Sequence, residues 1–89
     1  MKIKQMTSPR SGRPVPNQFV IYDDEDGSRH FQSYNTVIAI IDRHGKVTLD
    51  PKWNCSQTTS KYRSQFLGEN TRRTAEKIKL GEHKVEKLN

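Results

Sequence analysis

The sequence predicts an α+β domain in which an antiparallel sheet of four to five strands has two short C-terminal helices packed on one face. Runs of β-branched and aromatic residues, separated by turn residues, fill residues 18–50, and this pattern is typical of paired strands. After Pro51 the pattern changes to capping residues, apolar residues three or four apart, and a closing glycine, which indicates helices. With 89 residues the chain has room for one domain.

The strands are expected where such runs end at turn signals. The third run, Thr36 to Asp42, has a continuous apolar stretch of β-branched residues, so it should lie centrally in the sheet rather than form a helix. Acidic residues with Gly27 separate the first two runs, and Gly45 lies in the turn between the last two. The expected strands cover residues 18–22, 29–34, 36–42 and 46–50.

Two helices are expected over about 57–67 and 72–80. Hydroxyl residues precede the first helix and Gly68 ends it, while Asn70 or Thr71 begins the second helix and Gly81 ends it. The last segment, from His83 to Leu88, alternates imperfectly and is a candidate for a fifth, edge strand. Most of the core should come from these apolar side chains: Phe19, Ile21, Ile38, Ile40, Val47, Leu49, Trp53, Tyr62, Phe66, Leu67 and Ile78.

Residues 1–17 are expected to form a basic arm outside the domain that covers residues 18–89. The arm has four basic and no acidic side chains, and three of the four prolines of the chain, so we expect a mobile or extended segment. Residues 57–89 carry eight basic and four acidic side chains. With a net charge of +6 and basic residues at both ends, the chain favours a polyanionic partner.

Several other classes of protein are not expected. The longest apolar run, residues 37–41, is far shorter than a membrane span of about 20 residues, and the N-terminus has no apolar signal segment. We therefore expect a cytoplasmic protein with no membrane partner. The single cysteine, Cys55, excludes an intrachain disulfide and is expected to be a buried or partly buried structural thiol. No histidine spacing supports catalysis by Cys55, and the acids at 23–26 lack the spacing of a calcium loop, so no enzyme, cofactor or metal site is expected.

The candidate anion site lies at the start of the first helix. Hydroxyl groups and free backbone N–H groups at a helix start attract phosphate or carboxylate, although an elaborate N-cap explains the same residues. The second helix adds a basic surface, in which like charges four residues apart repel unless an anion, or a nearby glutamate, relieves them. The residues expected to bind nucleic acid or another anion are Thr58, Thr59, Ser60, Lys61, Arg63, Arg72, Arg73 and Lys77.

Three parts of the chain form a distinctive pattern: the run from Phe31 to Ala39 (FQSYNTVIA), Trp53, and SQTTSKYR with the following FLG in residues 56–68. In this pattern the chain resembles a family of small proteins encoded by bacteriophages and related mobile elements. No established activity comes with it, and where many similar sequences have histidine this one has Tyr62, which puts histidine-dependent chemistry in doubt. The resemblance implies a bacterial host cytoplasm and a role in host takeover or defence evasion, which includes inhibition of CRISPR effectors.

Two functions remain open from the sequence. The first is a non-enzymatic protein that contacts nucleic acid, or a host nucleoprotein complex, through its basic C-terminal helices. The alternative is a protein–protein inhibitor or adaptor of a host defence enzyme, which binds through the sheet face or an edge strand and uses the acidic turn at 23–26. A homodimer is compatible with either.

Overall fold

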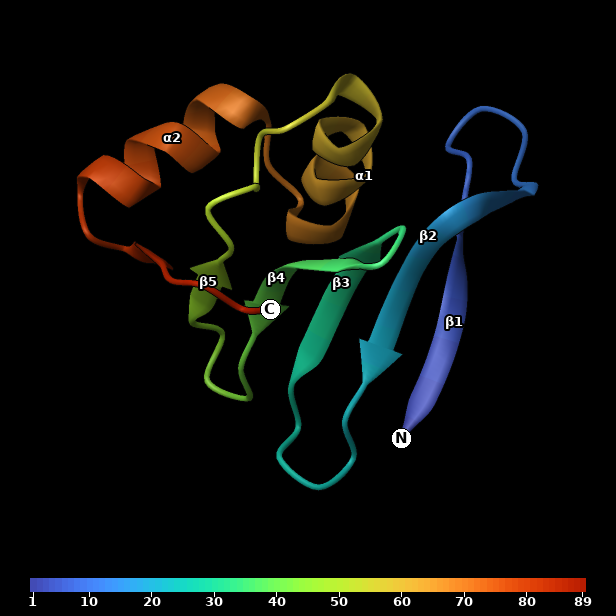
Figure 1. Cartoon of the computed structure of the whole chain (residues 1–89), viewed down its shortest axis with the longest axis horizontal. Helices are drawn as coiled ribbons and strands as arrows, with labels where there is room; N and C mark the ends of the chain where they lie inside the picture. The colour runs from blue at the N-terminus through green and yellow to red at the C-terminus, as the bar shows by residue number, and fades with distance from the viewer.

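The computed structural model describes residues 1–89 and confirms the α+β fold class, with the two helices next to each other after the main strands (Figure 1). None of the helices is long and apolar enough to cross a membrane. The elements, in chain order, are β1 (Lys2–Thr7), β2 (Pro14–Tyr22), β3 (Arg29–Ser33), β4 (Thr36–Ile41), β5 (Val47–Leu49), α1 (Gln57–Leu67), α2 (Thr71–Lys79) and β6 (His83–Val85).

The strands form one six-stranded sheet in the order in which they occur along the chain. Neighbouring strands from β1 to β5 are antiparallel, whereas β6 is parallel to β5. The sheet is therefore mixed and has one strand more than predicted. β6 runs parallel because the chain leaves β5, crosses one face of the sheet as two helices, and returns in the same direction.

The prediction of an arm at residues 1–17 is wrong for the strand-forming part of that segment. β1 pairs with β2 from Lys2 opposite Tyr22 to Thr7 opposite Pro14, with an irregularity between Gln5 and Thr7. The prolines suggested a break, but Pro14 is the first residue of β2, where a missing N–H does little harm. β1 shows no clear alternation of apolar and polar residues, because its lysines are exposed and Met6 is its one buried side chain.

The core lies between the sheet and the helices. Phe31 of β3 is fully buried, and its ring stacks on Phe66 of α1 with the centroids 5.8 Å apart. Tyr62 is also buried, while Trp53, Phe66, Leu67 and Ile78 pack against the core from partly buried positions. The buried apolar residues are Met6, Phe31, Ile38, Ala39, Ile41, Val47, Leu49 and Tyr62.

Both helices begin and end at the signals that the sequence contains. Ser56 caps α1, and its Oγ accepts a hydrogen bond from the Thr59 N–H (3.1 Å). Gly68 ends α1 in the left-handed conformation (φ 72°), which is accessible to glycine at low cost. Asn70 caps α2 by accepting from the Arg73 N–H (2.8 Å). Each cap contributes about 1 kcal/mol to helix stability.

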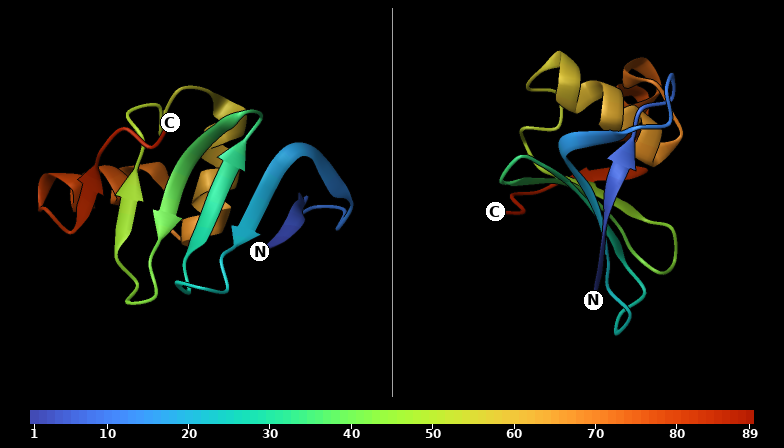
Figure 2. Two further views of the ribbon diagram at one scale, coloured as in Figure 1. Left: turned by 60° about the horizontal axis from the view of Figure 1, so that its bottom comes forward. Right: turned by 90° about the vertical axis from the view of Figure 1, so that its right-hand side faces the viewer.

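The opposite face of the sheet is not covered by any helix. In the left view of Figure 2 the sheet lies in front of both helices with no element in front of it. Side chains alternate between the two faces along a strand. Phe31 is buried on the helix side, so His30 and Gln32, which flank it in β3, lie on this open face. The expected core residues Phe19, Ile21 and Ile40 also lie there, half-buried, so their assignment to the core is wrong.

Candidate functional site

The N-terminal ends of α1 and α2 meet at one hollow in the surface. The hollow has a volume of about 410 Å³, and no aspartate or glutamate lines it. Its residues come from the loop before α1, the first turns of α1, and the first residue of α2. They are Asn54, Cys55, Ser56, Gln57, Ser60 and Thr71.

Four backbone N–H groups at these two helix starts have no partner in the chain. The caps use the N–H groups of Thr59 and Arg73, and Ser60 and Thr74 begin the regular helical bonds. The N–H groups left over belong to Gln57, Thr58, Thr71 and Arg72. Free N–H groups at a helix start carry the positive end of the helix dipole, so two such starts reinforce each other here.

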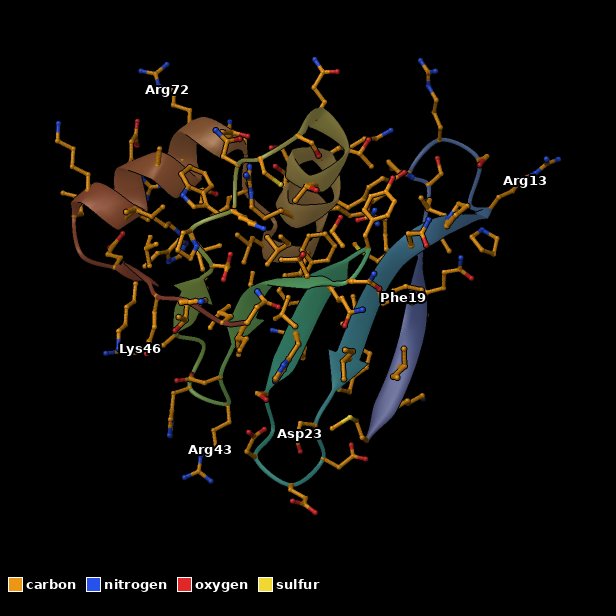
Figure 3. All side chains as sticks on the ribbon, in the orientation of Figure 1. Arg13, Phe19, Asp23, Arg43, Lys46 and Arg72 are labelled. Atoms are coloured by element: carbon orange, nitrogen blue, oxygen red, sulfur yellow. The ribbon has the colours of Figure 1, made fainter.

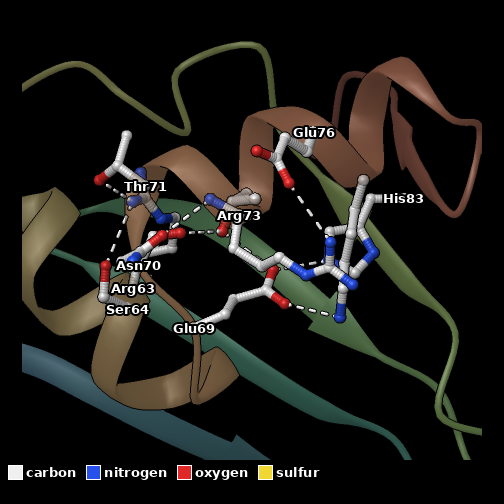
Figure 4. A network of polar contacts seen from close by, with 10 residues as sticks. Arg63, Ser64, Glu69, Asn70, Thr71, Arg73, Glu76 and His83 are labelled. Atoms are coloured by element: carbon white, nitrogen blue, oxygen red, sulfur yellow. Dashed lines mark hydrogen bonds and ion pairs between the residues drawn. The ribbon is translucent and has the colours of Figure 1, made fainter.

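Arg63 lies directly behind the hollow and is completely buried. Its Nη1 donates to the Trp53 carbonyl oxygen (2.7 Å) and its Nη2 to Thr71 Oγ1 (2.6 Å), as Figure 4 shows for Thr71. Longer contacts join it to Ser60 Oγ (3.5 Å) and Ser64 Oγ (3.3 Å). Ser60 and Thr71, which both line the hollow, therefore separate the guanidinium from solvent.

The charge of Arg63 has no carboxylate partner. Its guanidinium forms no ion pair, lies 5.0 Å from the centre of the Trp53 ring, and has an Nε–H with no acceptor. Burial lowers the pKa of Arg63, and Glu69 opposes this shift from a distance, but arginine stays protonated in proteins. A buried positive charge therefore adds to the two helix dipoles. We call the six lining residues, the four N–H groups and Arg63 together the helix-start site.

The residues of α1 that the sequence predicts to bind an anion differ in their exposure to solvent. Thr58 and Lys61 are exposed and Ser60 is half-buried, with its Oγ donating to Asn54 Oδ1 (2.8 Å). Thr59 is buried, and its Oγ1 contacts Ser33 Oγ of β3 (3.1 Å), which ties α1 to the sheet. Thr59 and Arg63 therefore cannot touch a bound anion directly in this structure.

The predicted residues of α2 are paired with glutamates. Arg72 and Arg73 each lie near Glu76, at 3.5 Å and 3.3 Å, but both side chains stay largely exposed. Lys77 Nζ lies 2.9 Å from Glu69 Oε2 and is mostly buried. The repulsion that the sequence suggested between Arg73 and Lys77 is thus relieved inside the protein.

Glu69 is the centre of a polar network (Figure 4), of which the sequence indicated only that Glu69 and Glu76 could neutralise part of the basic surface of α2. Its Oε1 accepts from His83 Nε2 (2.7 Å) and from Thr74 Oγ1 (2.9 Å). Burial alone would raise the pKa of Glu69, but the bonds from Lys77, His83 and Thr74 together hold it below the ordinary value. The network fastens α2 to β6, and no spacing of these residues along the chain signals it.

Cys55 and the histidines form no reactive pair. Cys55 is exposed at the edge of the helix-start site, contrary to the expectation of a buried thiol. Each histidine bonds elsewhere: His30 to Ser28, His44 to Arg43, and His83 to Glu69. No group of three or more His, Cys, Asp or Glu side chains is arranged to hold a metal ion.

Comparison with known proteins gives one match. Residues 1–82 match a family described as a family of unknown function, DUF8033. No curated protein and no solved structure matches the chain.

Proposed function

The chain belongs to the DUF8033 family, and we propose that it is a non-enzymatic protein that binds nucleic acid, free or in a host nucleoprotein complex, by holding a backbone phosphate at the helix-start site. The observation that carries this proposal is the convergence of two helix N-termini, with four free N–H groups, on a hollow without acids and with a buried, unpaired arginine behind it. Each of these features favours a negative charge in the hollow.

Exposed basic residues that directly follow lining residues in the chain, Lys61 after Ser60 and Arg72 after Thr71, extend the site along a polyanion. Lys61 lies one turn beyond Gln57 on α1, and Arg72 is the second residue of α2, with 89% of its side chain exposed. In Figure 3 Arg72 points away from the body of the molecule. Such side chains neutralise successive phosphates and release counterions, which makes binding weaken steeply with salt.

The resemblance to bacteriophage proteins suggests which partner to test first. In an infected bacterium the nucleic acid most relevant to a takeover or anti-defence protein is that of a host defence complex. A phosphate contact of this kind reads no sequence, so specificity would come from the complex in which the nucleic acid lies.

A protein–protein inhibitor or adaptor of a host defence enzyme is the second candidate, and the outer edge of β1 favours it. β1 is a six-residue edge strand, and its outer edge is open to pairing with a strand of another protein. The acidic turn at 23–26 lies at the same end of the sheet, since the N-terminal amine contacts Asp24 (3.7 Å). A host enzyme with a basic surface and a free strand would fit this edge.

Fluorescence anisotropy with labelled single- and double-stranded DNA and RNA separates the two candidates. We expect micromolar or tighter binding at about 50 mM salt that weakens by at least tenfold at about 200 mM. Arg72→Glu and Lys61→Glu should each weaken binding by about tenfold and reduce the salt dependence by about one phosphate contact.

Arg43→Glu is the matched control, because it changes the net charge equally at the opposite end of the molecule from Arg72 (Figure 3). An equal loss for Arg43→Glu would mean that general charge, and not the helix-start site, attracts the nucleic acid. No binding to any of the four ligands at low salt would refute the proposal and leave the edge of β1 as the candidate interface.

A further inference from the structure

Two exposed arginines lie on the turn between β1 and β2, which covers residues 8–13. Arg10 and Arg13 form no ion pair, and no acidic residue occurs in residues 1–22. The basic side chains of α2 described above differ, because a glutamate lies within 3.5 Å of each of them. The β1–β2 turn therefore carries two positive charges that no acidic group of the protein compensates, and such charges attract an anion.

Hydrogen bonds within the turn fix its backbone. The Ser8 N–H donates to the Arg13 carbonyl oxygen, and the Gly12 N–H donates to the Ser8 carbonyl oxygen, both at 2.9 Å. The hydroxyl oxygens of Ser8 and Ser11 accept from the N–H groups of Arg10 (3.2 Å) and Arg13 (3.3 Å). These bonds use the main chain of the two arginines and leave both guanidinium groups available to a ligand. An ordered turn also loses less conformational entropy on binding than a disordered arm does.

A stripe of exposed side chains on α1 joins this turn to the helix-start site. Gln57, Lys61 and Gln65 are four residues apart and exposed, so they lie along one face of the helix. Gln57 lines the hollow at one end of the stripe. At the other end Gln65 Nε2 donates to the carbonyl oxygen of Thr7, the residue before the turn (3.1 Å). No acidic residue occurs in residues 51–68, so α1 itself places no negative charge along this route.

We propose that the β1–β2 turn is a second phosphate-binding site, at which Arg10 and Arg13 hold the same strand of nucleic acid that the helix-start site holds. This inference rests on the proposed function, because one strand has to contact both places. In Figure 3 Arg13 and Arg72 lie in the upper part of the view on either side of α1, whereas Asp23 and Arg43 lie at the bottom. The strand thus crosses the end of the molecule that is remote from the acidic turn, which would repel it.

The length of the stripe sets the length of nucleic acid that can contact both sites. Gln57 and Gln65 are eight residues apart, which is about 12 Å along a helix. A nucleic-acid strand advances about 3.4 Å per phosphate, so about four nucleotides cover the stripe and a longer strand is needed to reach the arginines as well. Arginine contacts to phosphates read no bases, so the second site adds affinity without adding sequence preference.

Fluorescence anisotropy with labelled DNA and RNA of about 12 nucleotides, single- and double-stranded, tests the second site at several salt concentrations. A variant with both Arg10→Gln and Arg13→Gln should bind at least tenfold more weakly at about 50 mM salt. Its slope of log affinity against log salt should be smaller by about 1.5, which corresponds to two phosphate contacts. The variant should fold normally, because neither side chain forms a hydrogen bond or an ion pair.

The matched control carries Arg29→Gln and Arg43→Gln, which remove the same charge from two exposed arginines next to the turns at the other end of the sheet. It should bind within about threefold of wild type with an unchanged slope. Equal weakening by the two double variants overturns the second site, and the helix-start site then stands if Arg72→Glu weakens binding more than either.

Two further results would also overturn the proposal. If the turn variant weakens binding while Arg72→Glu and Lys61→Glu have no effect, the turn binds alone and no strand joins the two sites, which refutes the proposed function as well. If wild type binds none of the ligands at low salt, neither site holds nucleic acid.

Discussion

Arg63 is the residue on which the helix-start site depends most. It is the largest fully buried side chain, and it joins the Trp53 carbonyl of the connecting loop to Thr71 of α2. A buried charge costs free energy unless hydrogen bonds satisfy it, and here carbonyl and hydroxyl groups accept from Nη1 and Nη2 in place of a carboxylate, while the Nε–H has no acceptor. The same arrangement holds the two helix starts together and leaves the positive charge uncompensated.

We expect Arg63→Lys to lower the free energy of unfolding by about 1–3 kcal/mol, because an ammonium keeps the charge but cannot reach both partners with one planar group. Urea denaturation followed by circular dichroism measures the change. Arg43→Lys, at an exposed position, is the control and should stay within about 0.5 kcal/mol of wild type. Equal stability of Arg63→Lys and Arg43→Lys would show that the planar contacts of Arg63 contribute nothing.

Asp50 and Glu69 make stability depend on pH. Burial alone would raise the pKa of Asp50, but hydrogen bonds from the N–H groups of Leu88 and Lys52 and from Asn89 Nδ2 outweigh it, so the pKa is lowered. The pKa of Glu69 is lowered in the same way. A carboxylate whose pKa is lower in the folded state contributes stability above its unfolded pKa, which is about 4, and loses it as the pH falls further.

We therefore expect stability to change little from pH 7 to about 5 on account of these two groups, and to fall as the pH drops below about 4. Asp50→Asn should be less stable than wild type at pH 7 and should lose less stability on acidification. Thermal unfolding at a series of pH values measures both effects. Parallel curves for the variant and wild type would contradict the role assigned to the Asp50 carboxylate.

Among the helices and strands, the sequence predicts those whose start, end or type is set by residues a few positions apart. The caps at Ser56 and Asn70, the glycine at 68, and the β-branched run at 36–41 act within a few residues, and the structure has these elements at nearly the predicted positions. β1 was missed because its lysines are exposed on an edge strand and Met6 alone is buried. β1 is stabilised by its pairing with β2, and the local sequence pattern of residues 2–7 does not show this pairing.

Met6→Ala tests whether β1 is an integral part of the sheet. Met6 is 7% exposed and belongs to the core cluster, so its truncation should lower the free energy of unfolding by about 2–3 kcal/mol. Ile3→Ala, on the exposed side of the same strand, is the control and should cost less than about 1 kcal/mol. Hydrogen exchange adds an independent readout: fast exchange throughout residues 2–7 and no effect of Met6→Ala would restore the idea of an arm.

The two faces of the sheet differ. The helix side holds the core, the Glu69 network and the helix-start site, while the open side has a small hollow lined by Ile3, Phe19, Ile21 and Gln32. The sequence predicts helices on one face, but it cannot assign residues such as Phe19, Ile21 and Ile40 to a face, because apolar residues occur on both sides of this sheet. The residues predicted to bind an anion also differ in exposure. Lys61 and Arg72 are at the surface, whereas Thr59 and Arg63 are buried, and their burial depends on packing between distant segments, which the sequence does not show.

NMR of the ¹⁵N-labelled protein during titration with a short oligonucleotide tests directly whether the two helix starts bind phosphate. We expect the largest amide shifts at the four free N–H groups of Gln57, Thr58, Thr71 and Arg72, with little change in the turn at 42–46. Shifts that gather in another region, such as β1 or the open face, or that spread evenly over all basic residues, would contradict it.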